Sequence, residues 1–219
     1  EIYTLSLHDA LPIYELQASA FAHRRLVEEF QLAHRGGELG NADYPRITHL
    51  SINVDDFIAD PGKKLGALNY INACLRDVNL ESVDCGFIAC NTAHLLFDDL
   101  QQTTGGRLIS MIETAKESVA GQKIGLVATP ATISSGLYGE AIAPDEAGVL
   151  KIEEIIRQVI SGVPARDLAG GLQIEIEKLK NRGAEKVILG CSELSILGEF
   201  INLDYIIDPV TLIARKVIE

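Results

Sequence analysis

Two cysteines are the residues of this 219-residue chain that could most directly do chemistry. Cys90 and Cys191 each follow a short apolar run and precede small polar residues. A thiol at the end of a buried strand and just before a helix meets free backbone N–H groups and the positive end of the helix dipole, which lower its pKa. The side chains of Asn91, Thr92 and Ser192 can hydrogen-bond a carboxylate at the same place. The pattern predicts a small anionic ligand between two thiols, one of which acts as a base.

The other two cysteines fit a structural role. Cys85 precedes Cys90 by an odd number of positions in the same expected strand, so it faces the other side of the sheet, and Cys74 falls within a helical pattern. A zinc site built from Cys85, Cys90, His94 and Cys191 is the metal alternative. The opposite facing of Cys85 and the lack of a Cys-x-x-Cys pair argue against zinc, so we expect no metal ion.

Alternating strands and helices must position these residues. In the first half, a helix is expected from Tyr14 until Gly36 and Gly37 end its pattern, and a second helix over Gly66–Leu75. Strands are expected over Ile47–Val54 and Val83–Ala89. The second half repeats this plan, with helices over Ser110–Ala120, Gly148–Ile160 and Leu172–Asn181 and strands over Lys123–Ala128 and Val187–Leu189.

A closing helix is expected over Val210–Ile218. Asp208 is a typical N-cap residue for it, and Pro209 is a typical first helical residue.

This alternation predicts the α/β class with parallel sheets. Cys90 and Cys191 are roughly 100 residues apart, which is about the length of one α/β lobe. We therefore expect two lobes with one cysteine each. The first lobe would comprise residues 14–109 with 208–219, and the second would comprise residues 110–207.

The composition and charge of the chain limit the partners that it is expected to bind and the compartment in which it is expected to work. Apolar residues make up 47% of the chain, which suits a compact soluble protein. The net charge of −12 repels nucleic acids and anionic lipid surfaces. The four unevenly spaced cysteines and the lack of a signal-like start indicate an intracellular, cytoplasmic protein. No apolar run approaches the roughly 18 residues of a membrane span.

The strand-end motifs resemble those of a known family. Ala89–His94 (ACNTAH) and Leu189–Leu194 (LGCSEL) are similar to the two signature motifs of the aspartate/glutamate racemase superfamily. Gly125–Thr132, with Ser135, Gly136 and Tyr138, resembles the second-lobe loop of that family, and Ile207–Pro209 resembles its closing segment. The resemblance implies two flavodoxin-like lobes, each a short parallel sheet flanked by helices, with the active site in the cleft between them. It also implies no cofactor, and a homodimer.

The same resemblance assigns roles to residues. It implies racemisation of a small amino acid, with Cys90 and Cys191 exchanging the roles of base and acid at Cα. Substrate-binding residues would be Asn91, Thr92, Thr132 and Ser192. His94 and Glu193 would orient the catalytic or substrate-binding groups. Tyr138 is expected to pack against its neighbours rather than take part in catalysis. Arg46 and Lys151 are candidates for holding a substrate side-chain carboxylate, although surface solvation explains both.

The first thirteen residues stand apart from this likeness. Leu5–Ile13 resembles one reading frame of a widely used sequencing adaptor, so residues 1–13 are expected to be an artefact in place of the family's first strand and the loop after it. Ile2–Leu7 carries a strand-like alternation that could imitate the missing strand.

Other functions remain open at this level. The nearest alternative is related carbanion chemistry on a small dicarboxylate, by a decarboxylase or an isomerase, although the known decarboxylase pattern uses one cysteine. A ligand-binding member of the family that has lost turnover is the alternative from another class. A racemase dependent on pyridoxal phosphate is disfavoured, because the family likeness accounts for the chain without it.

Overall fold

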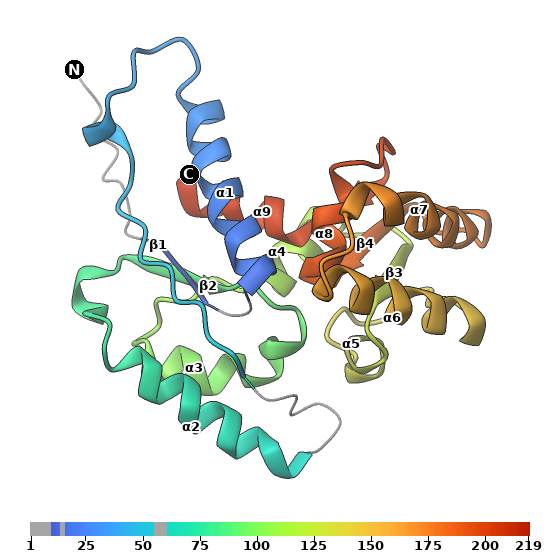
Figure 1. Ribbon diagram of the computed structural model, residues 1–219, viewed down its shortest axis with the longest axis horizontal. Helices are drawn as coiled ribbons and strands as arrows, with labels where there is room; N and C mark the ends of the chain where they lie inside the picture. The colour runs from blue at the N-terminus through green and yellow to red at the C-terminus, as the bar shows by residue number, and fades with distance from the viewer. Residues whose placement is uncertain (1–9, 14–15, 55–60) are drawn as a thin grey trace. The chain divides into compact units, whose positions relative to one another are not determined.

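The computed structural model describes residues 10–13, 16–54 and 61–219 (Figure 1). The chain divides into two compact units. Unit 1 contains the described residues up to Ala89, with Leu96–Ser110 and Val210–Glu219, and unit 2 contains Cys90–Leu95 and Met111–Pro209. Both units contain a parallel sheet and helices, which confirms the predicted α/β class.

Unit 1 is built on two parallel strands. β1 (Ala10–Ile13) pairs with β2 (Cys85–Ile88), and Leu108 adds a parallel bridge to Gly86. Phe87 and Ile88 of β2 are fully buried, as expected for a short apolar run in a parallel sheet. The helices are α1 (Leu16–Ala33), α2 (Lys64–Leu75), α3 (Phe97–Thr103) and α9 (Pro209–Ile218), with 3-10 helices η1 (Asn41–Asp43), η2 (Pro61–Lys63) and η3 (Leu80–Ser82).

Unit 2 contains a three-stranded parallel sheet in the order β3 (Ile124–Ala128), β4 (Lys186–Gly190), β5 (Ile206–Ile207). All five residues of β3 are buried, because helices cover the sheet. The helices of unit 2 are α4 (Met111–Ser118), α5 (Pro130–Ser135), α6 (Glu146–Ile160), α7 (Ala165–Asn181) and α8 (Ser192–Gly198), and of these α5 to α8 contact β3 or β4. The 3-10 helix η4 (Thr92–Leu96) begins in unit 2 and ends in unit 1. The apolar faces of α6 and α7 pack into one core with β3 and β4, through residues such as Val127, Ile152, Leu172, Ile176 and Leu189.

The periodic segments of the sequence correspond to these elements, with one exception. The expected strand over Ile47–Val54 is wrong, because Ile47 and Leu50 form only isolated bridges. The apolar side chains of this segment do not keep a two-residue period between Ile47 and Leu50, so no continuous apolar face is available to bury. Within the adaptor-like stretch, residues 10–13 form β1, whereas the strand-like alternation of Ile2–Leu7 lies outside the described residues.

His94 ties the segment Cys90–Leu95 to unit 2. Its Nε2 accepts a hydrogen bond from the backbone N–H of Met111 at 3.2 Å, so its Nδ1 carries the proton and donates to the carbonyl oxygen of Cys90 at 2.8 Å. Burial lowers the pKa of His94 from 6.5 to about 4, against the opposing effects of the backbone groups of Cys90 and Asn91 and the charge of Glu113. The ring is therefore neutral at pH 7 and uses both nitrogens to hold the strand end in place.

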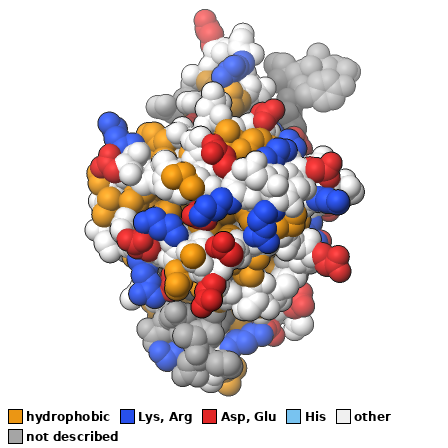
Figure 2. Space-filling view, turned by 90° about the vertical axis from the view of Figure 1, so that its right-hand side faces the viewer, with side chains coloured by type: hydrophobic (Ala, Val, Ile, Leu, Met, Phe, Trp, Pro, Cys, Tyr) orange, Lys and Arg blue, Asp and Glu red, His pale blue; other side chains and the backbone are white. Residues whose placement is uncertain are grey.

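Charged side chains are frequent on the face of the molecule shown in Figure 2. On the face shown in Figure 2, acidic and basic side chains are interspersed with smaller apolar areas. Ion pairs one helical turn apart contribute to this pattern, such as Arg157 with Glu153 on α6 (2.6 Å), and each contributes about 0.3–0.5 kcal/mol. In the part of the chain that the structure describes, no helix is both long and apolar enough to cross a membrane.

Acidification should destabilise the protein through His94. Because the folded-state pKa of His94 is lower than 6.5, the unfolded chain binds the extra proton first, and stability falls as the pH drops from about 6.5 to 4. We expect this group to contribute a loss of about 3 kcal/mol over that interval. Urea unfolding at several pH values measures it, and the His94→Gln variant should show a shallower pH dependence.

A core substitution provides the matched control for this experiment. Ile152→Val in unit 2 should lower the free energy of unfolding by about 0.5–1.5 kcal/mol and leave its pH dependence unchanged. An unchanged pH dependence in His94→Gln would contradict the role given to the imidazole.

Candidate functional site

The strand ends bring Cys90 and Cys191 into one unit. Cys90 follows β2 and opens the segment that groups with unit 2, and Cys191 directly follows β4 and is the N-cap residue of α8. The charge of Cys90 contributes to the raised pKa of Cys191, so the two thiols lie within electrostatic range of each other. The two cysteines thus belong to one local cluster.

Gly190 allows Cys191 to take its position. A Cβ atom at Gly190 would lie 2.6 Å from Cδ1 of Leu126 and 2.9 Å from Cβ of Ala128. No side chain fits there, so β4 can run close beside β3 up to its last residue. The extended backbone of Cys191 then turns the chain directly into α8.

The thiol of Cys191 is held in its protonated form. It is only 8% exposed, and its Sγ donates a hydrogen bond to Oε2 of Glu193 at 2.8 Å. Burial raises the pKa of Cys191 well above the usual value, and the charge of Glu193 raises it further. The expectation that the helix end would lower this pKa is wrong for Cys191, because α8 has only seven residues and burial beside a carboxylate outweighs its dipole.

Asn91 and Tyr138 form a buried polar pair. The phenol of Tyr138 donates a short hydrogen bond to Oδ1 of Asn91. Burial raises the pKa of Tyr138 well above its usual value, as do the charges of Asp208, Cys191 and Cys90, so the phenol is neutral and close to both cysteines. Sequence reasoning expected Tyr138 only to pack, and it missed this contact with a candidate binding residue.

Three threonines connect the Cys90 segment to the loop after β3. The hydroxyl groups of Thr92 and Thr132 are 2.9 Å apart, and Thr132 is fully buried. Thr129 is the N-cap of α5, since its Oγ1 accepts from the N–H of Thr132, and it also donates to the hydroxyl of Thr132 at 3.1 Å. Thr132 is therefore fixed from both sides and bridges two segments that are distant in sequence.

The remaining candidates differ in their surroundings. Ser192 is buried at the first position of α8, between Cys191 and Glu193. Lys151 pairs with Glu154 on the exposed side of α6, and Arg46 donates to the carbonyl oxygen of Ser82 in unit 1. The structure gives both cations surface partners of their own.

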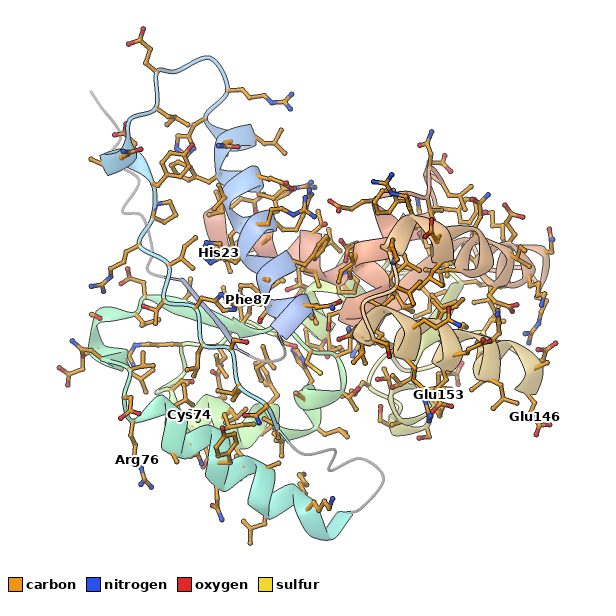
Figure 3. All side chains as sticks on the ribbon, in the orientation of Figure 1. His23, Cys74, Arg76, Phe87, Glu146 and Glu153 are labelled. Carbon is orange, nitrogen blue, oxygen red and sulfur yellow. The ribbon has the colours of Figure 1, made fainter. Side chains whose placement is uncertain are left out.

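The other two cysteines lie in unit 1. Cys74 is on α2 (Figure 3), and Cys85 is half-buried in β2, where burial, and then the charge of Asp84, raises its pKa to about 11. Among the described residues, no group of three or more His, Cys, Asp or Glu side chains could hold a metal ion.

The chain is similar to amino-acid racemases in sequence and structure. Residues 24–217 match the model of the Asp/Glu/Hydantoin racemase family. A glutamate racemase from Synechococcus sp. (strain CC9605) is 29% identical over 153 residues, which are 65% of this chain and 57% of that protein. A glutamate racemase from Corynebacterium kroppenstedtii is 28% identical over 166 residues, 71% of this chain and 57% of that protein. The matches thus span little more than half the length of these relatives.

Solved structures share the fold. Aspartate racemase from Picrophilus torridus superimposes with a TM-score of 0.70 at 20% identity, over 96% of this chain and 93% of that one. Glutamate racemase from Francisella tularensis, solved in complex with D-glutamate, has a TM-score of 0.63 at 18% identity, over 96% and 79% of the two chains. The family match covers most of the sequence, so this chain belongs to the Asp/Glu/Hydantoin racemase family.

Proposed function

We propose that this chain is a cofactor-independent amino-acid racemase that uses Cys90 and Cys191 as its two proton-transferring groups. The observation that carries the proposal is the placement of the two thiols, which follow the ends of β2 and β4 and belong to the same compact unit. Family membership and the names of the relatives support aspartate or glutamate as the substrate. In this proposal the working form is a homodimer, as the motif resemblance implies, and it acts in the cytoplasm.

The protonation states suggest which cysteine acts first as acid. Burial and the charge of Glu193 keep Cys191 as a thiol, so Cys191 can deliver a proton to Cα while Cys90, as a thiolate, removes one from the opposite face. The electron pair of the broken C–H bond passes into the α-carboxylate and returns to form the new C–H bond. Cys90 ends as a thiol and Cys191 as a thiolate, which is the form required for the reverse direction.

Buried polar groups would hold the substrate during this transfer. Asn91 offers amide N–H groups, Thr92 and Thr132 offer paired hydroxyls, and Ser192 adds a hydroxyl beside Cys191. General acid–base catalysis contributes about 10²–10⁴-fold to rate. Stabilisation of the negative charge that develops on the carboxylate, by fixed donors shielded from water, would supply much of the remainder.

Replacing either thiol should stop racemisation. For Cys90→Ala and Cys191→Ala, we expect the rate to fall at least about 100-fold, since each variant lacks one of the two proton carriers. Circular dichroism measures the conversion of L- and D-aspartate and of L- and D-glutamate. In deuterated water, the unsubstituted protein should incorporate deuterium at Cα from both enantiomers.

Cys74→Ala provides the matched control, because this thiol lies on α2 in unit 1 and should leave the rate unchanged. Full activity in either strand-end variant would reject the two-base mechanism. Release of carbon dioxide would indicate the decarboxylase alternative, and binding without exchange or carbon dioxide release would indicate a ligand-binding protein.

Removing the charge of Glu193 should shift the pH dependence. The carboxylate raises the pKa of Cys191, so Glu193→Gln should lower that pKa while the amide oxygen can still accept from the thiol. The limb of the kcat/KM profile that reports Cys191 should therefore move to lower pH in both reaction directions. Rates from each enantiomer, measured between pH 6 and 10, report this shift.

Glu199→Gln is the control, because Glu199 is an exposed residue at the C-terminal end of the same helix. Its pH profile should match that of the unsubstituted protein. Identical profiles for Glu193→Gln and the unsubstituted protein would show that Glu193 does not act on the thiol.

A further inference from the structure

The side-chain amide of Asn91 has a hydrogen-bond partner at its oxygen, and the structure describes none at its nitrogen. The side chain is 1% exposed, and its Oδ1 accepts the hydrogen bond from Tyr138. Its Nδ2 is buried and has no hydrogen-bond partner among the residues that the structure describes. A buried donor without an acceptor is unfavourable, and a ligand that places an acceptor atom there would satisfy it.

The loop that carries Tyr138 is shaped to bring the phenol inward. Gly136 and Gly139 flank it, both in the left-handed region (φ 69° and 70°), and the N–H of Gly139 donates to the carbonyl oxygen of Gly136 at 2.9 Å. Residues other than glycine are strained in this conformation. The resulting tight turn leaves Tyr138 only 3% exposed, with its hydroxyl against Asn91.

A neutral phenol in this position determines which way the amide faces. The pKa of Tyr138 is raised well above its usual value, so the hydroxyl keeps its proton and donates it to an acceptor. The acceptor end of Asn91 is Oδ1, and its occupation directs the Nδ2 donor away from Tyr138. An amide flipped by 180° would lose this hydrogen bond.

We propose that Tyr138 is a positioning residue that orients Asn91 so that its Nδ2 donates to the α-carboxylate of the amino-acid substrate. The inference rests on the proposed function and deepens it, because it gives Tyr138 the task of orienting a substrate-binding amide. A donor without a positive charge suits a carboxylate oxygen and disfavours the α-ammonium group, which has no acceptor to offer. Tyr138 thus determines which end of the zwitterion lies beside Cys90.

The test compares binding and turnover in Tyr138→Phe. We expect KM for L-aspartate or L-glutamate to rise about tenfold with little change in kcat, because the lost orientation weakens ground state and transition state alike. The dissociation constant of the same amino acid, measured by calorimetry in a Cys90→Ala background, should rise by the same factor without any turnover. Tyr205→Phe is the matched control, since Tyr205 is a more exposed tyrosine of unit 2 that lies beside Lys180, and its KM should be unchanged.

A double-mutant cycle separates positioning from simple packing. If Tyr138 acts through Asn91, Tyr138→Phe should have no further effect on affinity in an Asn91→Ala background. If the phenylalanine variant does not fold, Asn91→Asp replaces it, because the aspartate keeps an acceptor for Tyr138 but loses the donor. Its affinity for the amino acid should fall at least 100-fold.

The outcomes distinguish this inference from the proposed function. Racemisation by the unsubstituted protein, with the affinity of Tyr138→Phe unchanged, overturns the inference and leaves the function standing. Binding that depends on Tyr138, without racemisation, overturns the function and supports the inference. Equal effects of Tyr138→Phe in the presence and absence of the Asn91 side chain also overturn it.

Discussion

The buried hydrogen bond between the thiol of Cys191 and the carboxylate of Glu193 is the interaction on which the site depends. Both side chains are almost fully removed from water, so each must find its polar partner within the protein. Burial and then the carboxylate keep the sulfur protonated, and the bond gives the thiol a fixed direction. Two features of the backbone make the bond possible: Gly190 lets β4 run close to β3, and the extended conformation of Cys191 starts α8 at once.

Much of the fold could be predicted from local pattern. The uninterrupted apolar run of β3 predicts a buried strand, and the helical spacing of apolar residues in α6 predicts a helix. Both elements lie at the predicted positions. The strand predicted over Ile47–Val54 does not form, because apolar residues without a constant two-residue period do not define one face of a strand. The two-residue strand β5 is too short to leave a periodic signal at all.

The sequence predicts which residues belong to the site better than it predicts their protonation states and hydrogen bonds. Cys90 and Cys191 are recognisable because each ends an apolar run before small polar residues. The protonation of Cys191 could not be predicted, since it depends on burial and on the direction of the Glu193 side chain. The contact of Tyr138 with Asn91 joins residues 47 positions apart, and no pattern in either segment reveals it.

The hydrogen bonds from the Cys90 segment to the loop after β3 also bear on how this site could be redesigned. Thr92 meets Thr132, and Asn91 meets Tyr138, so the polar lining is shared between two stretches of chain. A graft that transferred only the cysteine-containing stretch from a relative would leave its amide and hydroxyl groups facing foreign neighbours. Chimeras and directed libraries should therefore exchange or randomise both stretches as a single module.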